Sequence, residues 1–276
     1  MAWTKSYTFL ELPFMNILLL STVLCVTPLS FAAGQSCSKQ SPAHTVALLE
    51  LYTSEGCNSC PPADKFVSGL RNQAASGSKF DDLTGEQVVP LSLHVDYWDY
   101  IGWNDRFAKS AFTVRQRWLA GLANSRTVYT PEVFVGGQEL RNWSAATVNA
   151  IKRVNGRPAQ ADIGLRLGNL TDGRLRLQVT ASSARPANLY LALYENGLAS
   201  VVKAGENRGV TLRHDYVVRD WIGPVAVPTT MTKNAFARVL AVPADAQAKN
   251  LGVAAFVQAE SGEVLQALAL PLCGDD

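Results

Sequence analysis

The order of apolar and polar residues divides the chain into two halves with different periods. Before residue 158, apolar runs of strand length alternate with stretches whose apolar residues recur every three or four positions. Beyond Arg157-Pro158 this helical period disappears, and apolar and polar residues alternate in short runs separated by turn residues. The pattern predicts an α/β domain over residues 45–158 and an all-β, sandwich-like domain over residues 160–273.

The first half is expected to contain buried strands and amphipathic helices in turn. A proline begins the first helix, at a position where a helix tolerates it. The predicted strands are Thr45–Tyr52, Gln87–Val95 and Val128–Val135, and the predicted helices begin near Pro61, Ser110 and Ala145.

The second half is expected to contain short strands whose side chains alternate between a buried and an exposed face. The predicted strands centre on Ile163–Leu167, Leu175–Val179, Leu189–Leu193, Leu251–Val257 and Val264–Leu270.

The first thirty residues have the composition of an export signal. Lys5 precedes the apolar run Phe14–Val26, and small residues at Ser30 and Ala32 suit a cleavage site. We interpret residues 1–32 as a signal peptide cut after Ala32, or after Ala33, and residues 33–44 as an extended leader. The alternative is a membrane anchor, although the run is shorter than the roughly 20 residues that span a bilayer.

Export implies an oxidising compartment, either the periplasm or the extracellular space, and a mature chain without a membrane span. Loss of Cys25 with the signal peptide leaves four cysteines, an even number that suits two bridges. Cys57 and Cys60 would form one pair. Cys37 and Cys273, near the two ends of the mature chain, would form the other, with two free thiols as the alternative.

Charge and composition exclude some classes of protein. The formal net charge is +2, charged residues make up 17% of the chain, and hydrophobic residues make up 47%. This is a globular composition rather than a disordered one. No block of Lys or Arg is present, so no nucleic-acid partner is expected.

The motif Cys57-Asn58-Ser59-Cys60 carries the candidate chemistry. A structural zinc site needs about four ligands, but no second C-x-x-C and no closely spaced histidine pair is present. The motif instead lies between a predicted buried strand and a predicted helix N-terminus, which stabilises a thiolate. Cys57, which we expect to be exposed, would attack a disulfide of a partner protein, and Cys60 would resolve the mixed disulfide, with no cofactor.

The segment Glu50–Asp64 (ELYTSEGCNSCPPAD) resembles the active-site segment of thioredoxin- and glutaredoxin-type proteins. More closely, the chain is similar to a family of secreted, thioredoxin-like bacterial proteins of unknown function. Segments similar to His94–Asp99, Tyr129–Pro131, Gly205–Gly209 and His214–Arg219 also occur in that family. The resemblance implies a thioredoxin-like α/β domain followed by a β-rich domain.

The resemblance also implies roles for three residues. Pro131 after Thr130 matches the cis-proline that faces the cysteine pair in the thioredoxin superfamily, so we expect a cis bond close to Cys57 and Cys60. Glu50 is a candidate for the buried acid that exchanges a proton with the resolving cysteine. Counted back from the first cysteine, Glu50 lies one position away from the acid of thioredoxin-type proteins. Because neighbouring strand residues face opposite sides of a sheet, this offset favours a structural role for Glu50.

Two other functions remain open from the sequence. Cys57, Cys60 and His94 would suit a copper(I) site in a metal-binding protein or metallochaperone. Alternatively, Cys57–Cys60 would be a static bridge in a binding module. His94 alone is expected to be a hydrogen-bonded structural residue, and no chemistry is assigned to His214, Asp215 or Arg219.

Overall fold

A computed structural model describes residues 1–6, 8, 37–71, 80, 83–229 and 234–273. The predicted signal peptide and its cleavage site lie almost entirely outside these residues. Met1–Ala33 form one unit, in which the described residues carry no helix or strand, and Gly34–Asp276 form a second, compact unit. Among the described helices, none has the length and apolar character needed to cross a membrane.

Strands predominate in the described part of the compact unit. Its three α-helices are α1 (Pro61–Ser68), α2 (Ser110–Leu122) and α3 (Trp143–Asn155). Its strands are β1 (Cys37–Gln40), β2 (Ala47–Thr53), β3 (Val88–His94), β4 (Glu132–Val135), β5 (Gln138–Glu139), β6 (Ala161–Thr171), β7 (Arg174–Ser183), β8 (Ala187–Glu195), β9 (Leu198–Val201), β10 (Thr211–His214), β11 (Val217–Val227), β12 (Asn234–Ala241), β13 (Leu251–Ala259) and β14 (Val264–Pro271).

One eight-stranded sheet runs through both halves of the sequence, in the order β14-β13-β8-β11-β3-β2-β4-β5. The halves join where β11 pairs in parallel with β3, with Val217 opposite Ser92. The predicted fold class, a thioredoxin-like α/β domain followed by a β-sandwich, is therefore wrong. Hydrophobic alternation shows which faces are buried, but it does not show that the edge of β3 is covered by a strand from the second half.

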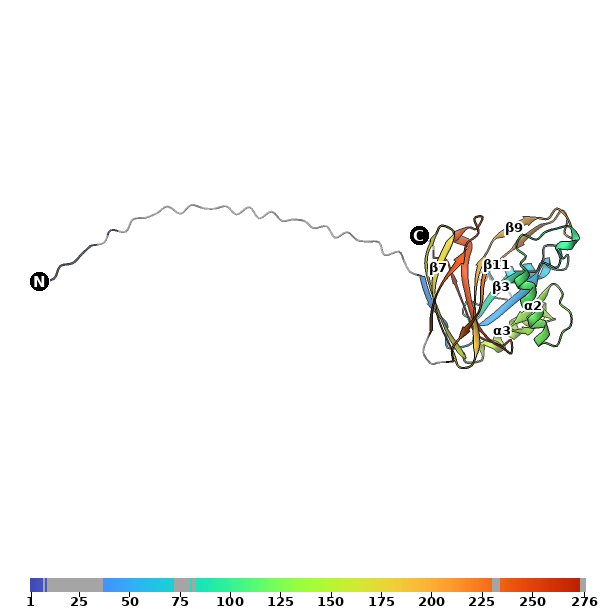
Figure 1. The fold of residues 1–276 in the computed structure, drawn as a ribbon, viewed down its shortest axis with the longest axis horizontal. Coiled ribbons are helices and arrows are strands. Elements are labelled where there is room, and N and C mark those ends of the chain that lie inside the picture. The colour runs from blue at the N-terminus through green and yellow to red at the C-terminus, as the bar shows by residue number, and fades with distance from the viewer. Residues whose placement is uncertain (7, 9–36, 72–79, 81–82, 230–233, 274–276) are drawn as a thin grey trace. The chain divides into compact units, whose positions relative to one another are not determined.

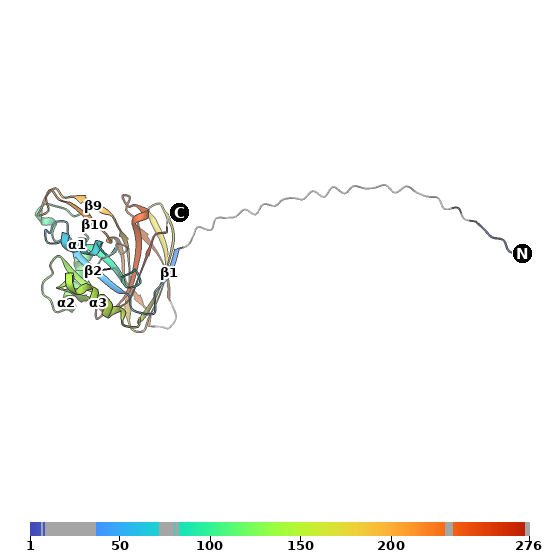
Figure 2. The same ribbon diagram turned by 180° about the vertical axis from the view of Figure 1, so that it is seen from behind.

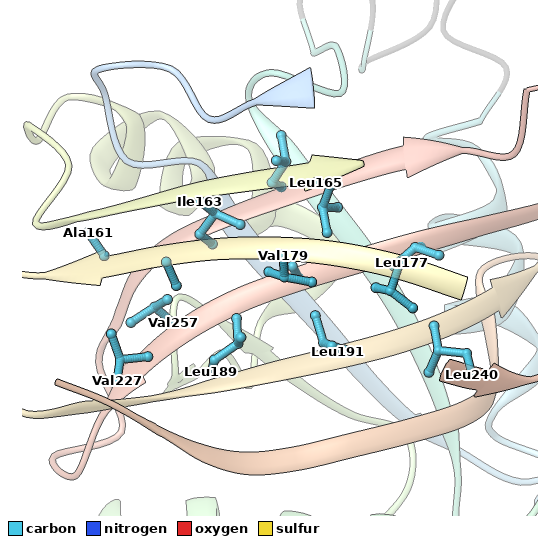
Figure 3. Close-up of a cluster of buried hydrophobic side chains, with 14 of the residues drawn as sticks. Ala161, Ile163, Leu165, Leu177, Val179, Leu189, Leu191, Val227, Leu240 and Val257 are labelled. Carbon is cyan, nitrogen blue, oxygen red and sulfur yellow. The ribbon is translucent and has the colours of Figure 1, made fainter. Parts of the chain in front are cut away.

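A four-stranded sheet in the order β1-β6-β7-β12 packs over part of the large sheet. Figure 3 shows the apolar side chains between the layers, with Ile163 and Val179 from the smaller sheet and Leu191 and Val257 from the larger one. The predicted leader contributes β1 to the smaller sheet, where Cys37 pairs with Leu167.

Side-chain alternation lets β8 contribute to two cores at once. Leu191 faces the four-stranded sheet, whereas Tyr190 and Ala192 point to the opposite face and share a core with Phe112 of α2. Helices α1 and α3 cover a third core on β2, β3 and β4. In Figure 1, α2 and α3 lie at one end of the compact unit and β7 lies at the other.

The predicted Cys37–Cys273 disulfide is present and joins residues that are 236 positions apart in the sequence. It connects β1 to the segment that follows β14. The two ends of the compact unit are therefore linked covalently as well as through their sheets.

Candidate functional site

The cysteine pair lies between the end of β2 and the start of α1. Cys60 is the N-cap residue of α1, and the backbone N–H of Cys60 donates to the carbonyl of Cys57 over 3.2 Å. Both residues are free thiols, and they are 1% and 0% exposed. An exposed Cys57 was expected, but in this structure Asn58 and Ser59 are the exposed members of the motif.

The two thiols have opposite electrostatic environments. The pKa of Cys57 is lowered to about 6, chiefly by a hydrogen bond from Cys60 and in addition by the side chains of Ser59 and Thr130, although burial opposes the shift. Burial raises the pKa of Cys60, and the neighbouring Cys57 raises it again. Cys57 is therefore the thiolate at neutral pH, and Cys60 remains a thiol that donates to it.

The helix N-terminus contributes to this asymmetry less directly than the sequence indicated. The first two residues of α1 are Pro61 and Pro62, which have no N–H to offer. The next two N–H groups, those of Ala63 and Asp64, donate to the carbonyl of Cys60. The backbone N–H of Ser59, inside the motif, is the amide that lowers the pKa of Cys57.

Thr130 contacts the cysteine motif, and the peptide bond between Thr130 and Pro131 is cis, as expected. The carbonyl oxygen of Thr130 is 3.7 Å from the Sγ of Cys57 and accepts a hydrogen bond from the Ser59 hydroxyl over 3.3 Å. The indole Nε1–H of Trp98 donates to the Thr130 hydroxyl over 2.7 Å. Trp98 therefore orients a residue that contacts Cys57, in addition to packing.

A loop from the second half of the chain also contacts the motif. The connection between β9 and β10 places Asn207 in a buried position, where its amide donates to the carbonyls of Glu55 over 2.8 Å and Cys57 over 2.9 Å. The adjacent Glu206 carboxylate accepts from the backbone N–H of Asn58 over 3.0 Å. The sequence singled out the segment Gly205–Gly209 through a family resemblance but gave it no role.

A buried group of charges lies next to the motif, where the sequence assigned no chemistry. The His214 ring approaches the Glu55 carboxylate over 3.3 Å and the Asp64 carboxylate over 3.9 Å. Burial alone would lower the pKa of His214, but Asp64 and Glu55 raise it to about 10. His214 is thus a buried cation between two carboxylates, and it comes from β10, which lies beside α1 (Figure 2).

His94 has a structural partner. Its Nδ1 lies 2.7 Å from the Asp105 carboxylate, which also accepts from the backbone N–H of Glu55 over 2.9 Å. Burial raises the pKa of Asp105, but His94 and the backbone N–H groups of Glu55 and Phe107 together outweigh it, and the net shift is downward. Within the described part of the chain, no three His, Cys, Asp or Glu side chains are arranged to hold a metal ion, and the His94 ring is engaged with Asp105.

Glu50 is engaged in a structural ion pair. Its carboxylate accepts from Arg115 Nε over 2.6 Å and from Arg115 Nη2 over 3.0 Å. The Tyr52 hydroxyl donates to the same carboxylate over 3.1 Å. These contacts satisfy Glu50 and favour the structural role over proton exchange with Cys60.

Glu132 is a buried acid that the sequence did not reveal, and it directly follows Pro131. One carboxylate oxygen accepts from Gln116 Nε2 over 2.6 Å, and the other has no hydrogen-bond partner. Burial raises the pKa of Glu132 to about 7, although the Gln116 contact lowers it. Its charge state therefore changes near neutral pH.

Fold and site together define a β-rich protein with a buried, electrostatically asymmetric dithiol at the start of a helix. Residues 48–258 match a family described as "Protein of unknown function (DUF1223)", and the chain belongs to this family. No curated protein matches the sequence.

Two solved structures share the fold. A crystal structure of an Agrobacterium tumefaciens protein, a structural genomics target, is 22% identical and has a TM-score of 0.57. The alignment covers 86% of this chain and 98% of that one. HBP35 of Porphyromonas gingivalis is 16% identical with a TM-score of 0.62, over 84% of this chain and 76% of its own.

Proposed function

We propose that this protein is an exported thiol–disulfide oxidoreductase that acts on protein thiols through Cys57 and Cys60. The observation that carries the proposal is the free Cys57–Cys60 dithiol at the start of α1, in contact with Thr130, whose bond to Pro131 is cis. The opposite pKa shifts of the two thiols, downward to about 6 for Cys57 and upward for Cys60, support it. Such a pair has a nucleophile that is ionised at neutral pH and a resolving thiol that stays protonated until the second exchange.

The reaction consists of two exchanges. The Cys57 thiolate attacks one sulfur of a substrate disulfide, which forms a Cys57–substrate disulfide and releases the other substrate sulfur as a thiolate. Cys60 then loses its proton and attacks the Cys57 sulfur, which forms the Cys57–Cys60 disulfide and releases the second substrate sulfur. The substrate gains two electrons, and a dithiol protein of the same compartment restores the reduced pair. With an oxidised pair and a dithiol substrate, the same steps run in reverse.

Two observations support export. The N-terminal sequence has the order of a signal peptide. In addition, the Cys37–Cys273 disulfide is of the kind that persists in oxidising compartments.

The proposal is tested by trapping the mixed disulfide. A Cys60→Ser variant should accumulate a covalent adduct with a model disulfide through Cys57, whereas a Cys57→Ser variant should accumulate none. In the wild-type protein, the alkylation rate of Cys57 should follow a pKa of about 6. A Cys57 pKa near the ordinary value of about 8.5, together with no adduct in the Cys60→Ser variant, would contradict the proposal and favour a non-catalytic dithiol.

A further inference from the structure

We propose that Asn207, in the β9–β10 connection, is a positioning residue that holds the Cys57 turn in its reactive geometry. The inference deepens the proposed function and rests on it. It makes the second half of the chain an integral part of the redox site.

The contacts of Asn207 have a specific arrangement. Its side-chain amide donates to the carbonyls of Glu55 and Cys57, two residues apart in the same turn. Because Asn207 is buried, water cannot replace either hydrogen bond if the amide is removed. Both ends of the segment Glu55–Cys57 are thereby fixed to one side chain from another part of the chain.

The β9–β10 connection is itself internally braced. The backbone N–H of Gly209 donates to the carbonyl of Val202 over 2.8 Å, and the N–H of Val210 donates to the carbonyl of Asn207 over 3.0 Å. Gly205 has a φ of 74° and Gly209 a φ of 85°, values that favour glycine. The loop therefore presents Asn207 from a fixed backbone, as a positioning group requires.

The position of the turn matters because it sets how the Cys57 sulfur lies against Thr130, a residue of a different segment whose side chain helps to lower the Cys57 pKa. The Ser59 hydroxyl, inside the motif, lies 3.2 Å from the Cys57 sulfur, and the Thr130 carbonyl, which accepts from the Cys57 thiol, lies 3.7 Å from it. A turn released from Asn207 would move the sulfur relative to Thr130, which is held independently by Trp98. A shift of a few tenths of an ångström would weaken these hydrogen bonds.

The test measures the Cys57 thiolate directly, by its ultraviolet absorbance against pH in the reduced protein. Asn207→Asp keeps the shape of the side chain but offers no donor, and Asn207→Ala removes the amide. In both variants we expect the Cys57 pKa to rise from about 6 by about one unit, so that the thiolate fraction at pH 5 falls about tenfold. Arg208→Ala, an exposed position in the same loop, is the matched control and should keep the wild-type pKa.

Thermal unfolding shows whether each variant is folded. A folded Asn207→Ala variant with the wild-type Cys57 pKa would overturn the inference and leave the proposed function intact. A wild-type pKa near the ordinary thiol value would defeat the proposed function first, and the inference with it.

A measurement on the wild-type protein covers the case in which both variants unfold. The side-chain amide resonances of Asn207 should shift with the titration of Cys57, because the amide is bonded to the Cys57 carbonyl. Resonances that do not move through this pH range would overturn the inference without any substitution.

Discussion

Arg115 and Glu50 form a bidentate ion pair in which both side chains are almost completely buried. Aromatic rings from the second half of the chain surround the guanidinium, whose carbon lies 4.9 Å from the ring centres of Tyr190 and Phe256. Arg115 belongs to α2 and Glu50 to β2, so the pair joins the helical layer to the sheet at the point where the two halves of the chain meet.

Replacing Arg115 by Ala should therefore destabilise the protein strongly. The change leaves the Glu50 carboxylate buried without its counter-ion, which typically costs about 3–5 kcal/mol. Denaturant unfolding measures the loss. The control is Arg141→Ala, which breaks the ion pair of an exposed arginine with Glu139 and should leave stability unchanged within error. Equal effects of the two substitutions would show that burial of the Arg115 pair is unimportant.

Glu132 should make the protein less stable as the pH rises. Its pKa is raised to about 7 in the folded state, above the ordinary value, so the folded form binds this proton more tightly than the unfolded form. The contribution of Glu132 to the free energy of unfolding is therefore complete below about pH 4 and is lost as the pH passes through about 7.

A Glu132→Gln variant should lack this loss. Relative to wild type, we expect the melting temperature of the variant to rise by about 5–10 °C between pH 5 and pH 8, because the raised pKa corresponds to about 2.6 kcal/mol over this interval. Glu139→Gln is the control at a nearby, more accessible carboxylate. If the difference between Glu132→Gln and wild type does not change with pH, Glu132 is ionised throughout.

His214 should also lose its contribution to stability as the pH rises, but at a higher pH than Glu132. Its pKa is raised to about 10, so its contribution is complete below pH 6.5 and is lost as the pH rises through about 10. A His214→Gln variant should be less stable than wild type at pH 7, because Glu55 and Asp64 lose the cation between them. Stability measured at several pH values should show this difference shrinking toward pH 10. A constant difference would indicate that His214 contributes by packing alone.

The Cys37–Cys273 disulfide should contribute substantially to stability. It closes a loop of 236 residues, for which the chain-entropy model gives about 5 kcal/mol as an upper figure. A Cys37→Ser/Cys273→Ser variant should melt at a lower temperature than the oxidised wild type. A reductant should lower the melting temperature of the wild type far more than that of the double variant. Equal sensitivity to reductant would assign the effect to Cys57 and Cys60.

Local patterns predicted the individual elements well, because each depends on nearby residues. The helices expected near Pro61, Ser110 and Ala145 are α1, α2 and α3, and each strand predicted in the second half is present. Ser110 itself begins α2. The cis bond before Pro131 was also expected, through family resemblance.

The long-range pairing was not predictable in the same way. Nothing in the segment around Ser92 indicates that Val217 lies beside it, because a buried strand has the same composition whichever strand covers its edge. The same limit hid the roles of His214 and Asn207. Both are polar residues in the second half whose burial beside Cys57 depends on that pairing, and neither has a local signal that reveals its partners.

The Cys37–Cys273 bond has one more consequence, for proteolysis. The described compact unit lies between these two cysteines and is therefore a covalent ring, closed by backbone on one side and by sulfur on the other. A protease that cuts one peptide bond within the ring opens it but releases no fragment. A nicked molecule keeps its mass until a second cut or a reductant separates the pieces, so it would be visible on a reducing gel and hidden on a non-reducing one.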